Sequence, residues 1–188
     1  MTSSPAPGRP QKAKQRLSKQ IILQSALPIV QEQGAEALTF RGLAERLGVT
    51  PMAVAYHSGS KRDLLADLVD FAFEGTLDGL RSVPPKAHAR AILRAYYLRA
   101  RLNANLLRAV LEDTSLMGSV LVEITDELNA CTRKLDGKDD NVLLHLLIDY
   151  THGFVLSAAS GQGNLLTVDG YLRGIDWILA RTGGPLGG

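Results

Sequence analysis

The sequence predicts an all-α protein built from two helical parts. Apolar residues recur at the i, i+3, i+4 spacing of amphipathic helices along nearly the whole chain, and no stretch alternates as a β-strand does. Charge also divides the chain: residues 1–65 carry nine Lys or Arg and four Asp or Glu, a net of +5, whereas residues 66–188 carry twelve and fifteen, a net of −3. A basic head on an acidic body indicates a polyanion-binding module joined to a separate domain, although a basic tail that only aids solubility is the alternative.

Composition is that of an ordinary soluble globular protein, with 45% hydrophobic and 21% charged residues in a chain of 188. The single cysteine, Cys131, cannot form an intrachain disulfide, which suits a reducing compartment. No secretory leader is visible, and polar side chains interrupt the longest apolar region, around 142–159. We therefore expect a cytoplasmic protein with no membrane span.

The N-terminal third predicts a disordered basic arm over 1–16 and three short helices over 17–63. The first helix begins after Ser18 as N-cap and ends at Gly34, with Pro28 expected to kink or split it. The second follows Thr39, and Thr50 caps the third, which has proline at its first position.

The second part, over 64–182, predicts further helices and a frayed tail over 183–188. A fourth helix opens at Ser60, with Asp63 placed for a near capping box. Pro84 and Pro85 form the next break, and 87–111 fits one long helix or two abutting helices equally well. Helices over about 116–134, 142–160 and 167–181 follow.

The spacing of small residues within 18–57 is what a helix-turn-helix requires. Ala44 permits a close approach of two helices, Gly48 makes the tight turn, and Val49 with Val54 fills the space between them. In such a module the helix after the turn lies in the major groove of DNA.

The stretch 38–53, LTFRGLAERLGVTPMA, resembles the DNA-binding domain of TetR/AcrR-type transcriptional regulators. So does the spacing His57-x-x-x-Lys61-x-x-Leu64-Leu65, and the resemblance covers about residues 17–70. It implies an all-helical fold of nine or ten helices, a homodimer on a palindromic double-stranded DNA operator, and repression relieved by a small-molecule effector bound in the C-terminal domain.

The resemblance also implies which side chains meet DNA. Thr39 and Arg41 lie at the start of the second helix, and Lys61 opens the fourth helix. The start of the recognition helix carries Thr50, Pro51, Met52 and Ala53, and its end carries Tyr56 and His57. Tyr56 and His57 could instead only cap the small hydrophobic core. The family usually has tyrosine where this chain has Ala55, so either Tyr56 replaces it or affinity depends on the basic arm.

The last two predicted helices are apolar on almost every side, which requires packing partners on several faces. Two such helices from each of two chains would form a four-helix bundle with twofold symmetry. The predicted dimer interface comprises Leu147, Phe154, Tyr171, Ile175, Trp177 and Ile178.

Two alternatives remain at this point. His145, Asp149 and His152 share one helical face and could in principle ligate a metal or serve an enzyme, but no nucleophile elbow, phosphate-cradling glycine loop or HExxH run accompanies them. We therefore expect no enzymatic activity, metal or cofactor. A dimer that binds DNA constitutively, with no ligand, is the second alternative.

Overall fold

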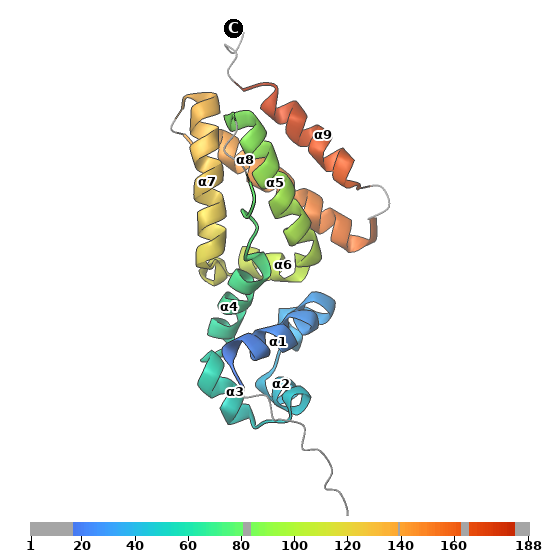
Figure 1. Cartoon of the computed structure of the whole chain (residues 1–188). Helices are drawn as coiled ribbons and strands as arrows, with labels where there is room; N and C mark the ends of the chain where they lie inside the picture. The colour runs from blue at the N-terminus through green and yellow to red at the C-terminus, as the bar shows by residue number, and fades with distance from the viewer. Residues whose placement is uncertain (1–16, 81–83, 139, 163–165, 183–188) are drawn as a thin grey trace, which may run out of the picture.

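The computed structural model describes residues 17–80, 84–138, 140–162 and 166–182, and within them it contains nine α-helices and no strand. The predicted arm over 1–16 and tail over 183–188 lie outside the described residues. Figure 1 shows two layers: α1–α3 form one end of the molecule, α5–α9 form a bundle at the other, and α4 joins them. The all-α prediction is confirmed.

The first layer consists of α1 (Lys19–Gln33), α2 (Phe40–Leu47) and α3 (Pro51–Ser58), with a 3-10 turn over Ala35–Ala37. The predicted caps are present: the side chains of Ser18, Thr39 and Thr50 accept hydrogen bonds from backbone N–H groups three residues on. Of the two effects expected at Pro28, a kink or a split, the split does not occur: α1 runs through Pro28 and buries Ala26 and Val30 on either side of it.

Helix α4 (Lys61–Phe73) belongs to both layers. It begins with the predicted capping box, in which Ser60 and Asp63 each bond the other's backbone N–H. The backbone N–H and the hydroxyl of Ser60 both donate to the Asp63 carboxylate, and these two bonds hold the pKa of that carboxyl below its usual value. The helix contacts α1 and α3 at one end and α5 and α7 at the other. A displacement of α4 is therefore felt in both layers.

The second layer consists of α5 (Pro85–Leu102), α6 (Ala104–Glu112), α7 (Ser119–Asp136), α8 (Val142–Ser157) and α9 (Val168–Leu179). A 3-10 turn over Thr114–Leu116 precedes α7, and a short π-helical segment over Ala158–Gln162 follows α8. Residues 87–111 could have formed one long helix or two abutting helices, and the structure has two. They part at Asn103, which is buried and donates its side-chain amide to the carbonyl of Arg99.

A stack of aromatic rings ties α9 to the bundle. Tyr97 and Tyr171 are fully buried, with ring centroids 4.2 Å apart and nearly parallel. The Tyr171 hydroxyl donates to the carbonyl of Leu93 at 3.2 Å and lies 2.8 Å from the hydroxyl of Thr151. One side chain of α9 thereby bonds both α5 and α8.

Helix α8 and the residues after it, 142–160, form the one stretch in the described residues that is long and apolar enough to cross a membrane. By itself this is weak evidence for a span, because core helices of soluble proteins share the property. One face of α8 packs on the bundle through Leu147 and Val155, both 0% exposed, while Val142 and Leu146 remain exposed. An apolar face therefore stays uncovered within one chain.

We predict that Tyr171→Phe lowers the free energy of unfolding by about 1 kcal/mol, because a buried hydroxyl with two partners is lost without a change of shape. Urea unfolding at fixed protein concentration measures the change. Tyr56→Phe removes a hydroxyl from a side chain that is 85% exposed and should leave the midpoint unchanged. Equal midpoints for all three proteins would contradict the assigned role of the Tyr171 hydroxyl.

Candidate nucleic-acid interface

The turn between α2 and α3 has the geometry that the sequence predicted. Gly48 adopts the left-handed conformation (φ 65°, ψ 35°), and its N–H is directed at the carbonyls of Ala44 and Glu45. Ala44 and Val54 are buried where the two helices meet. Helix α3 is consequently held across α2 with its other side free.

The free side of α3 carries the predicted recognition residues. Pro51, Met52, Tyr56 and His57 are exposed, Met52 by 78% and Tyr56 by 85%, whereas Val54 and Ser58 face the core. Tyr56 therefore does not cap the small hydrophobic core, and that alternative is wrong for it. Its ring meets the edge of His57, with centroids 5.2 Å apart.

The two capping threonines stand at the N-termini of α2 and α3. Each side-chain oxygen accepts from the helix, Thr39 from the N–H of Gly42 at 3.1 Å and Thr50 from that of Ala53 at 3.2 Å. A hydroxyl used as an acceptor keeps its own hydrogen for a phosphate oxygen. Ala53, half-buried, has its N–H engaged by this cap and so offers mainly its methyl group.

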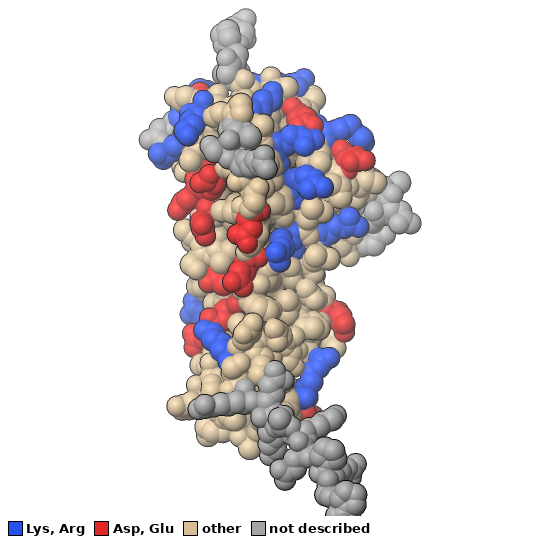
Figure 2. All heavy atoms as spheres, viewed as in Figure 1, with Lys and Arg blue, Asp and Glu red and all other residues tan. Residues whose placement is uncertain are grey.

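Two cations flank the recognition helix. Arg41 Nε lies 3.3 Å from Glu45 Oε1 with both side chains largely exposed, and Lys61 Nζ lies 3.7 Å from Glu36 Oε2. Exposed pairs of this kind contribute about 0–1 kcal/mol, so both cations can exchange their partners for phosphates at little cost. Figure 2 shows acidic side chains gathered mainly over the other layer, toward α7, away from α2 and α3.

Ala55 is half-buried and brings no polar group to the surface. The hydroxyl of the next residue, Tyr56, projects from the exposed side of the same helix. This placement supports the interpretation that Tyr56 takes over the role of the tyrosine that the family usually has at the preceding position.

The predicted polar face of α8 does not gather into one cluster. His152 turns inward, where its Nε2 lies 2.9 Å from the hydroxyl of Tyr96, while His145 and Asp149 are exposed. Within the described residues, no group of three His, Cys, Asp or Glu side chains is placed to hold a metal ion.

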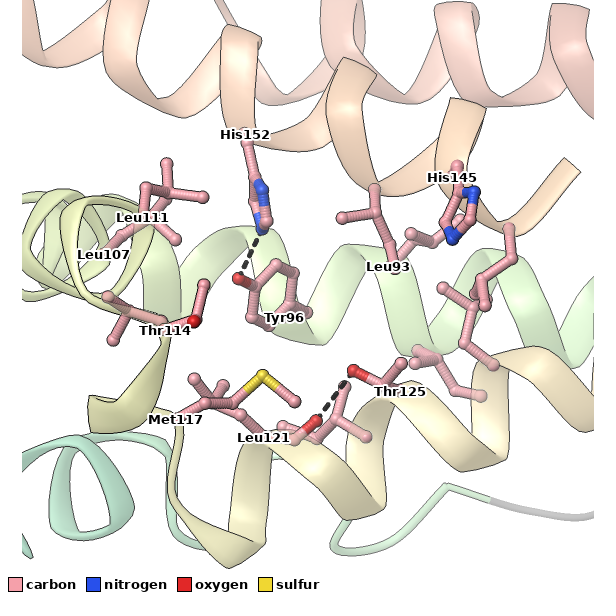
Figure 3. A pocket seen from close by; sticks show the side chains of 16 residues that line it. Leu93, Tyr96, Leu107, Leu111, Thr114, Met117, Leu121, Thr125, His145 and His152 are labelled. Carbon is pink, nitrogen blue, oxygen red and sulfur yellow. Dashed lines mark hydrogen bonds between the residues drawn. The ribbon is translucent and has the colours of Figure 1, made fainter. Parts of the chain in front are cut away.

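The inward turn of His152 leads to a feature that sequence reasoning missed. A cavity of about 260 Å³ lies between α5, α6, α7 and α8, and Tyr96 and His152 stand in its wall. Figure 3 shows His152 descending from α8 onto Tyr96 of α5, with leucines of α6 and α7 around them. The two residues are 56 positions apart in the sequence, so no local spacing signals their pairing.

The predicted dimer residues divide between core and surface. Leu147, Tyr171 and Ile175 are 0% exposed and Ile178 is 8% exposed, so these four belong to the core of one chain. Phe154 is half-buried against Tyr97 and Tyr171, and Trp177 is 59% exposed. For the four buried residues the prediction of direct contact needs correction: their side chains already have partners within the chain.

A recognition helix exposed after a left-handed turn, with cations on either side, is the geometry of a helix-turn-helix module of the DNA-binding type. Residues 22–68 match the family described as "Bacterial regulatory proteins, tetR family". The tetracycline repressor protein class C of Escherichia coli is 40% identical over 55 residues. That match spans 29% of this chain and a quarter of the repressor's length.

Solved structures show a likeness of fold over most of the chain. A TetR-type transcriptional regulator of Streptomyces coelicolor superposes with a TM-score of 0.72 at 21% identity, covering 87% of this chain and 96% of that one. Mycobacterium smegmatis BioQ gives a TM-score of 0.71 at 23% identity, covering 87% and 97%. BioQ bound to its natural double-stranded DNA operator gives 0.66 at 24% identity, covering 85% and 98%. At these identities the likeness shows a shared fold, while the match to the tetR family itself covers residues 22–68.

We predict that Gly48→Ala lowers the free energy of unfolding by about 1–2 kcal/mol, because an L side chain is strained in the left-handed conformation. A Cβ at this position meets no atom within 4 Å, so the cost is one of backbone conformation alone. Chemical unfolding measures it. Gly48→Asn is the matched control, since asparagine tolerates this conformation better and should lose less; an equal loss in both variants would contradict the conformational cause.

Proposed function

We propose that this protein is a dimeric transcriptional repressor that binds a palindromic operator and leaves it when a small molecule enters the C-terminal domain. The observation that carries the proposal is the exposure of Met52 and Tyr56 on α3, directly after the left-handed turn. An apolar side chain and an aromatic hydroxyl have no structural use in water, whereas thymine methyl groups and phosphates would bind both.

The uncovered face of α8 and α9 supports the dimer. Val142, Leu146 and Trp177 are 61%, 50% and 59% exposed, and Arg181 lies over the Trp177 ring at 3.6 Å. A second copy would bury these apolar side chains, and the buried residues beneath them would hold the interface rigid. Two recognition helices arranged in this way should sit about 34–36 Å apart to reach successive major grooves.

Hydrogen bonds join the walls of the cavity to the DNA-binding layer. Asn105, in the first turn of α6, donates its side-chain amide to the carbonyls of Val30 and Gln31 at the end of α1. Asp70 of α4 accepts from the backbone N–H groups of Ser119 and Val120 at the start of α7. Since α6 and α7 both line the cavity, a ligand that moves either one also acts on α1 or α4.

The proposal keeps the predicted division into a DNA-binding domain over 17–63 and an effector-binding and dimerisation domain over 64–182. Because α4 spans this boundary and packs on both sides, it is the natural lever between them. The protein would work in the cytoplasm, where its operator is accessible, and the proposal assigns it no catalytic activity.

Selection from random duplex DNA tests the first step and should yield a palindrome bound in preference to bulk DNA. Lys61→Ala should weaken binding about uniformly across sequences and reduce the slope of log K against log salt by about 1, because one phosphate contact is lost. Met52→Ala should instead alter base preference. Lys138→Ala, which removes an exposed cation next to the end of α7, is the control and should change neither. Equal affinity for all sequences at physiological salt would refute operator recognition.

The dimer has its own prediction. Trp177→Glu and Leu146→Glu should each shift the sedimenting species from dimer toward monomer at micromolar concentration, because each buries a charge in an apolar interface. Met52→Glu places the same charge on an exposed apolar side chain of α3 and should leave the mass unchanged. A wild-type monomer that still binds a palindrome tightly would refute the interface.

A further inference from the structure

The cavity in the C-terminal domain lies between four helices, is partly open to solvent, and has a mostly apolar lining. Ile92 of α5, Leu107 of α6, Leu121 of α7 and Ile148 of α8 represent its walls. Its volume of about 260 Å³ is near the small end of the range for ligand pockets, about 300–1,000 Å³. It therefore suits a compact molecule that is driven from water mainly by its apolar surface.

Charge is missing from this wall. None of the sixteen described residues that line the cavity is Lys, Arg, Asp or Glu. Transfer of an unpaired ion into such surroundings costs several kcal/mol. Burial also lowers the pKa of His152, although the nearby carboxylate of Asp149 opposes the shift. Burial therefore disfavours the charged imidazole, which makes His152 a poor partner for an anion.

Two of the polar side chains in the cavity wall form a hydrogen-bonded pair. Tyr96 Oη lies 2.9 Å from His152 Nε2, and both side chains project into the cavity in Figure 3. Thr125 lines it too, but its hydroxyl donates to the carbonyl of Leu121 on its own helix. If the phenol donates to the imidazole, its oxygen can still accept a bond; if the imidazole donates, the phenol hydrogen is free. Either arrangement can form a hydrogen bond with a hydroxyl group of a ligand, and the second can also donate one to a carbonyl.

We infer that the effector is an uncharged, mainly apolar molecule carrying one hydroxyl or carbonyl group, which Tyr96 and His152 recognise. This inference rests on the proposed function, since it names the ligand class of the effector domain. Thr114 and the exposed His145 stand elsewhere in the wall, and the His145 imidazole is the group there that could bond a carboxylate instead.

Calorimetric titration of the full-length chain at pH 7.5 tests the inference with four probes of matched shape: 1-naphthol, naphthalene, 1-naphthoate and 1-naphthylmethylammonium. The wild-type protein should bind 1-naphthol at least tenfold more tightly than either ion. Tyr96→Phe should weaken the binding of 1-naphthol about tenfold and leave the affinity for naphthalene unchanged, because only 1-naphthol can form the hydrogen bond.

Tyr97→Phe is the matched control. Tyr97 neighbours Tyr96 on α5, but it is absent from the cavity wall, and its hydroxyl has no hydrogen-bond partner among the described residues. It should leave all four affinities unchanged. The comparison of probes on the wild-type protein needs no variant, so it stands even if Tyr96→Phe folds poorly.

Gel shifts with the selected operator, on the same preparation, separate the two levels of the argument. Operator binding together with a preference for 1-naphthoate, or with no binding of any probe, would overturn the inference and leave DNA binding intact. Failure to bind any DNA sequence selectively would refute the proposed function, whatever the probes show.

Discussion

The burial of α5 among the other helices of its layer is the constraint on which the rest of the structure depends. Six of its side chains are buried, and the helix contacts α4, α6, α7, α8 and α9. Its residues meet α9 through the stacked rings of Tyr97 and Tyr171, and they meet α8 through Tyr96 and His152. Close packing on one side and a cavity on the other are thus set by neighbouring residues of a single helix.

The same helix fixes the position of the DNA-binding layer. It ends at Asn103, whose side chain accepts a hydrogen bond from Gln31 of α1 at 2.9 Å, and α6 begins at the next residue. A second polar contact joins α4 to α7: the carboxylate of Asp70 accepts a hydrogen bond from the backbone N–H of Val120 at the N-terminus of α7. A Cβ on Gly118, just before α7, would overlap this carboxylate. Glycine at that position lets the two helices approach closely enough for the cap. These polar contacts are directional, so they transmit small displacements better than apolar packing alone.

Local signals in the sequence were sufficient for the DNA-binding layer. Ser18, Thr39 and Thr50 cap helices because their oxygens reach a backbone N–H three residues on, and that requirement is visible in the chain itself. The need for glycine at position 48 likewise follows from the left-handed backbone conformation of that residue. Pro28 does not split α1, whose residues Ala26 and Val30 are buried on either side of it and pack the helix in place.

The second layer could be predicted only in outline. A helix that is apolar on every side must be buried, but its sequence does not say which neighbour buries it. Leu147 and Ile175 were therefore assigned to a dimer interface, whereas the core of the chain itself covers them. The end of α5 depends on Asn103, whose partner Gln31 is 72 residues away, and the cavity depends on a pair 56 residues apart. Such contacts arise from the packing of distant helices, which no spacing in a single sequence reveals.

An uncharged effector also constrains how the signal travels. It brings no field to the DNA surface, so it cannot weaken phosphate contacts through electrostatics, and any effect must come from a different affinity for two arrangements of the helices. A complete reversal of a 1:99 population needs about 5.5 kcal/mol of differential binding, but a tenfold loss of operator affinity needs only about 1.4 kcal/mol. The smaller amount is comparable with one or two hydrogen bonds of the kind that Asn105 and Asp70 make. In the proposed mechanism, release from DNA would therefore require no large rearrangement of the bundle, only a ligand that fits the cavity better when α6 or α7 has moved enough to strain those contacts.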